Sequence, residues 1–422
     1  METTKKAPLF TNLMKWFMGA MILANIASSM YAMLLPIYIT QLGASIKQVG
    51  IVFTISAGAS LFLQVIGGWV SDQIGRLKAI AIGSIGGVIG LFFIALVPSW
   101  EWLVVAIIVS QIPYALVGPS FGAFIAENST EETRGQVYGI TDTVFQITGI
   151  VGPPLGGYLM GFYGFKTMML ISASLYTVAA GLRIWMATTQ KSKSETEKST
   201  NDLSAVSFKK SLRTMFKMMF AGSVITWIFV TDGVRDTAFR LSGELQPLYL
   251  DQVGGISVEQ IGILGAIFSF AMMFTPIISG KLSDKYGERV PISSGFFLMT
   301  VAFVIFLNAS SFLGFALTWV VFGAAVGIMS PAYQSYISKV VPKKMLGIFS
   351  GVFYGSIGLI SLPAPYLGAL LWENFTPKTP FIVTAVVVTL AVIPAWFIFK
   401  PIKGKVDLGV DLSEFETDSE EN

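Results

Sequence analysis

The feature that most constrains this chain is a series of apolar stretches, each long enough to cross a lipid bilayer. A transmembrane helix needs about 20 mostly apolar residues to span the hydrocarbon core. Segments of this kind recur along the whole sequence, separated by short polar connections. Twelve transmembrane helices are therefore predicted, near residues 13–40, 46–70, 79–97, 101–125, 136–162, 167–187, 218–250, 257–280, 291–308, 312–337, 346–372 and 379–399.

The composition agrees with lipid as the main solvent and excludes several kinds of chemistry. Only 13% of the 422 residues are charged, against about 25% in a soluble domain. The absence of cysteine and histidine excludes disulfides, thiolate metal sites and serine–histidine protease chemistry. Any proton transfer must then use carboxylates, and we expect neither a metal nor a cofactor. The net charge of +3 is too small to indicate a nucleic-acid partner.

Basic residues predict which side of the membrane each connection faces, because cytoplasmic loops carry an excess of Lys and Arg. With the N-terminus inside, 23 of the 28 basic residues, Arg183 among them, fall at cytoplasmic positions, and two lie within a span. Only Lys47, Lys166 and Lys378 fall outside. The protein is therefore predicted to be a multi-pass protein of the cell membrane with both termini in the cytoplasm.

Polar segments divide the chain into parts. An N-terminal bundle at 1–187 and a C-terminal bundle at 218–402 are expected on either side of a cytoplasmic linker at 188–217. Residues 208–217 within the linker have the pattern of a basic amphipathic helix on the inner leaflet. The acidic tail at 403–422 is predicted to be disordered and cytoplasmic.

The two halves of the sequence align with an offset near 212. Before the second span the offset is 211, which one inserted residue explains. Two similar halves in the same orientation predict an all-α membrane protein of two pseudo-symmetric six-helix bundles, with a site between them and alternating access. The matches include Gly68–Gly75 with Gly280–Gly287, Gly149–Gly157 with Ser361–Ala369, and Gly43 with Gly254.

Two motifs in these repeats resemble those of a known family. The loop after the second span, with Gly68, Asp72, Gly75 and Arg76, resembles the major facilitator signature G-x-x-x-D-x-x-G-R-x-K, and Gly280, Asp284 and Gly287 repeat it. The resemblance covers about residues 10–400 and implies a twelve-helix secondary transporter. The block with Gly149, Gly152, Pro153, Gly156 and Gly157 is similar to the motif of the drug/proton antiporter branch.

One departure from the antiporter branch concerns the fourth span. The arginine usual there is missing, and the stretch Val104–Pro119 has only Gln111 and Tyr114 as sizeable polar side chains. The family resemblance places spans 1, 4, 7 and 10 around the substrate cavity. Its predicted lining therefore includes Asn25, Ser29, Gln111, Tyr114, Arg235 and Arg240.

The resemblance also assigns conformational roles to the signature loops. Asp72 would cap the N-terminus of the eleventh span near Leu346–Ile348, and Asp284 would cap the amides near Gly135–Val137. The glycine and proline residues of the antiporter motif would fix how the fifth and eighth spans meet. An ordinary solvated aspartate and ordinary small-residue packing are the alternatives.

A pair of charges near each signature loop changes sign between the halves. Arg76 and Glu127 in the first half correspond to Glu288 and Lys339 in the second. If the members of each pair touch, the joint reversal keeps both contacts attractive. We therefore expect a lock between loop and helix in each half, with coincidence among interfacial charges as the alternative.

The seventh span carries a stripe of charges in an otherwise apolar segment. Its members fall near one helical face: Asp232, Arg235, Asp236, Arg240 and Glu244. Charged groups inside a membrane are costly and usually functional. Asp232 is the first candidate for proton coupling because it lies deepest, Asp236 is the second, and Asp142 in the fifth span is the third. A self-neutralised structural network is the alternative.

The predicted function is proton-coupled antiport that exports small amphipathic compounds, by a monomer that acts alone in the bilayer. Proton-coupled uptake of a small organic anion, held by Arg235 or Arg240, is the nearest alternative. A non-transporting sensor on the same fold is another. A membrane enzyme is disfavoured, because paired arginines leave Asp232 and Asp236 no vacant shared-proton site.

Overall fold

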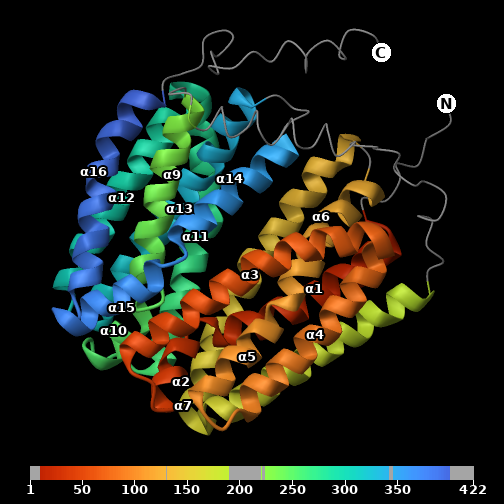
Figure 1. Cartoon of the computed structure of the whole chain (residues 1–422). Helices are drawn as coiled ribbons and strands as arrows, with labels where there is room; N and C mark the ends of the chain where they lie inside the picture. The colour runs from red at the N-terminus through yellow and green to blue at the C-terminus, as the bar shows by residue number, and fades with distance from the viewer. Residues whose placement is uncertain (1–9, 130, 190–219, 221–223, 342–345, 400–422) are drawn as a thin grey trace, which may run out of the picture. The chain divides into compact units, whose positions relative to one another are not determined.

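The computed structural model describes residues 10–129, 131–189, 220, 224–341 and 346–399, whose regular structure is entirely helical (Figure 1). Residues 190–217 of the predicted linker, including its amphipathic helix, and the acidic tail lie outside the described residues. In chain order the helices are α1 (Asn12–Ala32), α2 (Leu35–Gln41), α3 (Ile46–Ile74), α4 (Arg76–Leu96), α5 (Trp100–Ser110), α6 (Ile112–Asn128), α7 (Glu131–Thr189), α9 (Val224–Gly243), α10 (Gln246–Gln252), α11 (Val258–Tyr286), α12 (Arg289–Asn308), α13 (Phe312–Val340), α14 (Leu346–Ser361), α15 (Ala364–Asn374) and α16 (Thr379–Ile398).

The helices account for the twelve predicted spans. Ten helical segments among the described residues are long and apolar enough to cross a membrane. The longest, α7, covers two predicted spans, and Gly164, with φ 79° and ψ 163°, interrupts its helical backbone between them. Helix α9 falls outside the count and carries four charged residues. Dividing α7 and adding α9 gives twelve spans, which confirms the predicted fold class.

Four predicted spans consist of two consecutive helices, and a proline is the second residue of the second helix each time. Proline lacks the N–H that would continue the preceding helix, yet its fixed φ suits the first turn of a new one. The breaks separate α1 from α2, α5 from α6, α9 from α10 and α14 from α15. The prolines are Pro36, Pro113, Pro247 and Pro365.

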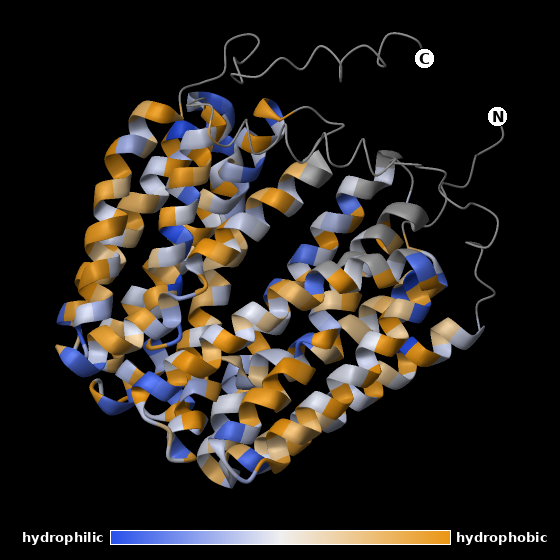
Figure 2. Ribbon diagram, in the orientation of Figure 1, coloured by the Kyte–Doolittle hydropathy of each residue, from blue (hydrophilic) through white to orange (hydrophobic). Residues whose placement is uncertain are grey.

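Large apolar side chains remain uncovered along the helices. Phe62, Leu313 and Leu390 keep 68%, 78% and 61% of their surface exposed. Figure 2 shows hydrophobic residues along the length of most helices, with hydrophilic residues concentrated near their ends. A soluble protein would bury such side chains. Lipid acyl chains are the solvent that suits these helix faces.

The described helices pack into two compact units. One comprises residues 1–198 with 246–270, and the other comprises 199–245 with 271–422, so that α11 contributes to both. An aromatic cluster supports the core of each unit. In the first, Phe17 stacks on Phe121 with ring centroids 5.0 Å apart, and in the second Phe306 lies 4.9 Å from Phe381. The division at the linker remains a prediction.

Equivalent helix contacts recur within the two units. The Ser172 hydroxyl donates to the carbonyl of Ala27 (2.7 Å), and the Thr384 hydroxyl donates to that of Ala238 (2.8 Å). These residues correspond through the sequence offsets of 212 and 211. The internal repeat therefore extends from the sequence to individual helix–helix hydrogen bonds.

Glycine conformation corrects one detail of the alignment. Gly43 and Gly255 both have positive φ, 90° and 62°, in the turns before α3 and α11. A positive φ favours glycine because it has no side chain. Gly43 therefore corresponds to Gly255, and its predicted alignment with Gly254 is wrong. The inserted residue lies just before this turn, where the sequence alone does not determine which residues of the two halves correspond.

Candidate functional site

Helix α9 in the second unit carries a buried acid–base pair. The side chain of Asp232 is only 5% exposed, and its Oδ1 lies 2.5 Å from Nη2 of Arg235. The two atoms do not have the alignment of a hydrogen bond. The folded protein depends on this pairing, because removing either partner of a buried ion pair destabilises a protein by about 3–5 kcal/mol.

Helix α13 covers this pair with an aromatic side chain. The Tyr333 hydroxyl donates to Thr231 Oγ1 over 3.3 Å, directly beside Asp232 in the sequence. The guanidinium carbon of Arg235 lies 5.2 Å from the centre of the Tyr333 ring. Arg235 is thus held by the carboxylate of Asp232 and by a cation–π contact. Tyr333 and Thr231 were not among the predicted site residues, because an uncharged side chain gives no signal by itself in the sequence.

A second acid–base pair lies one turn further along α9. Asp236 Oδ2 accepts a hydrogen bond from Arg240 Nε (2.7 Å) and another from the Ser361 hydroxyl (2.8 Å) at the end of α14. This pair is more exposed to solvent than the first, because the side chain of Asp236 is 28% exposed and that of Arg240 is 42% exposed. Ser361 was also missed as a site residue, although it is the repeat counterpart of Gly149. The two pairs match the self-neutralised arrangement considered from the sequence.

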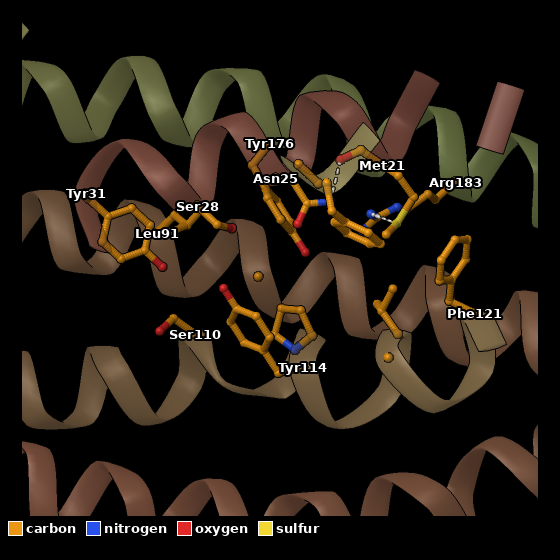
Figure 3. A pocket seen from close by; sticks show the side chains of 16 residues that line it. Met21, Asn25, Ser28, Tyr31, Leu91, Ser110, Tyr114, Phe121, Tyr176 and Arg183 are labelled. Carbon is orange, nitrogen blue, oxygen red and sulfur yellow. Dashed lines mark hydrogen bonds between the residues drawn. The ribbon is translucent and has the colours of Figure 1, made fainter. Parts of the chain in front are cut away.

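A cavity of about 190 Å³ lies inside the first unit. Figure 3 shows its lining side chains, which come from α1, α4, α6 and α7 and from Ser110 at the end of α5. Most of the wall is apolar, and Arg183 is the single charged residue among those that line it. The lining residues are Met21, Ala24, Asn25, Ser28, Tyr31, Gly87, Leu91, Ser110, Pro113, Tyr114, Val117, Gly118, Phe121, Phe145, Tyr176 and Arg183.

The position of Arg183 corrects the sequence analysis, which counted it among the cytoplasmic cations. Its surface is only 2% exposed, and its guanidinium contacts Ser84 Oγ and Met21 Sδ, each at 3.1 Å. Because Arg183 lies close to the end of a predicted span, its position alone suggested a loop. The direction of its side chain into the bundle depends on how α7 packs, which the sequence count could not include.

The four cavity residues predicted in the first half divide into two groups. Asn25 and Tyr114 line the cavity, whereas Ser29 and Gln111 do not. The Ser29 hydroxyl lies within hydrogen-bonding distance of the carbonyl oxygens of Ile26 and Thr148, so it serves the packing of α1 on α7. Asp142, the third proton-coupling candidate, is exposed on α7.

The signature loops have the same backbone form in both units. Gly75 and Gly287 have φ of 88° and 77°, each between two long helices. Arg76 donates from Nη1 to Ser71 Oγ (3.1 Å), and Asp284 is exposed. The side chains of Asp72 and Glu127 lie outside the described part of the chain, so their predicted contacts stay predictions.

The second signature loop contains the expected ion pair. Glu288, next to Gly287, contacts the ammonium group of Lys339 at the end of α13 and accepts a hydrogen bond from the Ser335 hydroxyl (3.0 Å). Its side chain is 3% exposed, whereas that of Lys339 is 53% exposed. The carboxylate of Glu288 is therefore buried, and the exposed side chain of Lys339 contacts it from the solvent side.

The glycines of the antiporter-like block allow two close helix contacts within the first unit. A Cβ on Gly156 would overlap the carbonyl oxygen of Met30 in α1. On the other side, a Cβ on Gly157 would lie 2.6 Å from the carbonyl oxygen of Val258 at the start of α11. The predicted meeting of the fifth and eighth spans is thus present, with backbone against backbone.

Comparison with known proteins agrees with this architecture. The family model described as "Major Facilitator Superfamily" matches residues 17–235 and 237–410. The multi-drug resistance efflux pump PmrA of Streptococcus pneumoniae serotype 4 is 24% identical over 389 residues, which cover 89% of this chain and 92% of PmrA. The multidrug resistance protein MdtG of Salmonella paratyphi C is 23% identical over 388 residues, covering 89% and 92%.

Solved structures add a likeness of fold. A crystal structure of a POT family transporter in complex with 5-aminolevulinic acid superposes with a TM-score of 0.70, covering 91% of this chain and 94% of that chain. The sequence identity is 13%, so this likeness concerns the fold alone.

Proposed function

Because the chain belongs to the Major Facilitator Superfamily, we propose that it is a proton-coupled antiporter that exports small amphipathic compounds by alternating access. PmrA and its homolog in Lactococcus lactis are named as multi-drug resistance efflux pumps, and the chain is accordingly a multi-pass membrane transporter of small molecules rather than an enzyme. Three parts of this function are proposals: the proton as coupling ion, export as the direction of transport, and amphipathic compounds as the substrate class.

The observation that carries proton coupling is the buried pair of Asp232 and Arg235 in α9. A carboxylate is the group available for proton binding in a chain without histidine. Protonation of Asp232 would remove the charge that holds Arg235 and leave the guanidinium on the ring of Tyr333. Such a change in a buried ion pair can bias a transporter whose two states differ by a few kcal/mol.

Asp236 is proposed as the second proton site. Its two hydrogen bonds, from Arg240 and Ser361, tie α9 to the end of α14. Proton binding to Asp236 would weaken both contacts and loosen this junction. Asp142 ranks third, because its side chain is exposed on α7.

Export of amphipathic compounds is supported by the names of the relatives and by the antiporter-like block. PmrA and MdtG are described as multidrug resistance proteins. In this chain the block holds α7 tightly against α1 and α11, which suits a role in fixing the helix geometry on which exchange depends. We further propose residence in the cell membrane, cytoplasmic termini and action as a monomer.

Uptake of an organic anion is the alternative, with Arg235 or Arg240 as its binding group. Both arginines already pair with aspartates of α9, which makes them less available to a substrate. A transport assay separates export, uptake and a sensor that moves nothing.

Transport by the purified protein in liposomes tests the proposal. The lumen is made acidic, and the probes are ethidium and 1-naphthalenesulfonate, whose charges do not change with pH. An antiporter will accumulate a probe in the acidic lumen as protons leave, and an uncoupler will abolish the accumulation. Accumulation that is the same with and without the proton gradient would contradict proton coupling. If neither probe is transported, export of such compounds is contradicted.

A further inference from the structure

The cavity in the first unit contains a charge that the proposed proton mechanism does not use. Arg183 reaches it from α7 and is 2% exposed. The ion pairs formed by Asp232, Asp236 and Glu288 lie in the second unit, and none of them involves Arg183. No Asp or Glu is among the residues that line the cavity.

The partners of this guanidinium within the protein are weak. Its Nη atoms contact a serine hydroxyl and a thioether sulfur, and its Nε has no hydrogen-bond partner in the described structure. The ring of Tyr176 lies 5.9 Å from its central carbon, and the neutral Tyr176 hydroxyl is a further polar partner of the guanidinium. A buried cation normally pairs with an acid or coordinates an anion. The positive charge of Arg183 is thus left without the counter-charge that its burial requires.

The rest of the cavity supplies hydroxyl groups and an apolar wall. Figure 3 shows the side chains of Tyr31, Tyr114 and Tyr176 pointing into one space from α1, α6 and α7. Phenol hydroxyls can donate to an anionic oxygen. The remaining wall includes Leu91 and Phe121, which suit a small hydrocarbon or aromatic group.

We propose that this cavity binds the anionic head of an amphipathic substrate, with the guanidinium of Arg183 as its counter-charge. The ligand class is a small monoanion, a carboxylate or sulfonate on an apolar body. This inference rests on the proposed export function and specifies which compounds it serves. Arginine suits the task, because its planar fork of donors matches two oxygens of one acid group.

The size of the cavity agrees with a head group rather than a whole drug. Its volume is about 190 Å³, below the roughly 300–1,000 Å³ usual for sites that enclose drug-sized ligands. A single benzene ring with one acid group is a suitable probe. A larger substrate would place its acid here and leave the remainder of the molecule outside the cavity.

Binding of benzoate and its neutral isostere benzamide to the purified full-length protein tests the inference. Calorimetry is expected to show at least tenfold tighter binding of benzoate than of benzamide, and weaker binding still of benzylammonium. In Arg183→Gln the preference for benzoate should disappear, and in Arg183→Lys part of it should return. Equal affinity for benzoate and benzamide in the unmodified protein would overturn the inference, as would a preference that survives in Arg183→Gln.

Two further variants separate a binding role from a structural one. Arg289→Gln is the matched control, because Arg289 Nε is also buried without a partner but lies over Trp396 in the second unit. Its benzoate preference should be unchanged. Gly118→Leu fills the cavity from a position where a Cβ meets nothing within 4 Å. This variant should keep its Tm and lose benzoate affinity at least tenfold, which tests the site even if Arg183→Gln fails to fold.

The transport assay shows which of the two proposals has failed. A protein that accumulates ethidium in the acidic lumen but shows no benzoate preference overturns the anion site alone. A protein that binds benzoate through Arg183 but moves neither probe overturns the export function and leaves the anion site intact.

Discussion

Glu288 and Lys339 lie 51 residues apart in the sequence and form an ion pair between the second signature loop and the end of α13. The carboxylate is sheltered, and Ser335 supplies a further hydrogen bond. The sequence predicted this pair from a joint change of sign, since the corresponding residues of the first half are Arg76 and Glu127. The contact exists in the second unit, and its conformational role is open to direct test.

Charge reversal tests the second-unit pair. Glu288→Lys and Lys339→Glu should each place like charges together and destabilise the protein by roughly 1–3 kcal/mol, between the values for exposed and buried pairs. The double reversal should recover much of the loss. A double-mutant cycle in thermal unfolding and in transport rate measures this coupling. Purely additive losses would show that the contact contributes nothing.

The same reversal applies to the first-half pair. Arg76→Glu and Glu127→Arg should each impair transport, by about 1 kcal/mol per lost pair at a wet interface. The combined variant has the polarity already present in Glu288 and Lys339 and should regain activity. Failure of the double variant to recover would mean that Arg76 and Glu127 do not touch.

The stability contribution of Glu288 should depend on pH. Burial by itself favours the neutral acid, but hydrogen bonds from Lys339, the backbone and Ser335 outweigh it and lower the pKa of the Glu288 carboxyl below its ordinary value. The unfolded carboxyl, with a pKa of about 4.3, therefore binds a proton more readily than the folded one. The contribution is complete above that value and is lost as the pH falls through the lower folded pKa.

Thermal unfolding between pH 7 and pH 3 checks this dependence. The difference in Tm between the unmodified protein and Glu288→Gln should be constant above about pH 5 and should shrink below about pH 4.3. Other titrating groups cancel in this difference. A gap that stays constant down to pH 3 would show that Glu288 is not held in its charged form by these contacts.

Asp232→Asn should abolish accumulation against a gradient but allow exchange of substrate without one. The amide keeps the size of the side chain and cannot bind a proton at neutral pH, so coupling is lost while the cavity remains. Because Arg235 loses its counter-charge, we also expect about 3–5 kcal/mol of lost stability, which unfolding measures separately. Accumulation like that of the unmodified protein would transfer the coupling role to Asp236, with Asp236→Asn as the next variant.

Asp72→Ala should slow transport without much loss of substrate affinity. The proposed cap of the eleventh span acts on conformational exchange, and a lost N-cap costs about 0.5–2 kcal/mol. Binding and turnover are measured on the same preparation, with Asp284→Ala as the corresponding change in the second half. Normal turnover together with weak binding would contradict the assignment.

Gly156→Ala should destabilise the protein, because its Cβ would overlap the carbonyl oxygen of Met30. Gly368→Ala should do the same, since its Cβ would overlap the carbonyl oxygen of Leu241 in the other unit. Overpacking of this kind costs about 1–3 kcal/mol. Gly181→Ala in α7 is the control, because a Cβ there meets nothing within 4 Å. Equal Tm values for all three variants would show that the helices can shift at no cost.

Much of the architecture could be predicted from local properties of the sequence. The length of the apolar stretches located the spans, and the internal repeat located the two signature loops. Both signals depend only on the type and order of the residues. The pairing of Asp232 with Arg235 and of Asp236 with Arg240 was available for the same reason, since three- and four-residue spacing brings side chains together on any helix.

The contacts between helices were decided only by the tertiary structure. Ser361 and Tyr333 lie far along the chain from α9, and no local pattern marks a single polar or aromatic residue as a partner. Arg183 is the clearest case. By position it looked like one more cytoplasmic cation, but the packing of α7 turns its side chain into a cavity. Sequence periodicity determines that a helix forms, whereas the rotation of that helix against its neighbours decides whether a charge meets water or the protein interior.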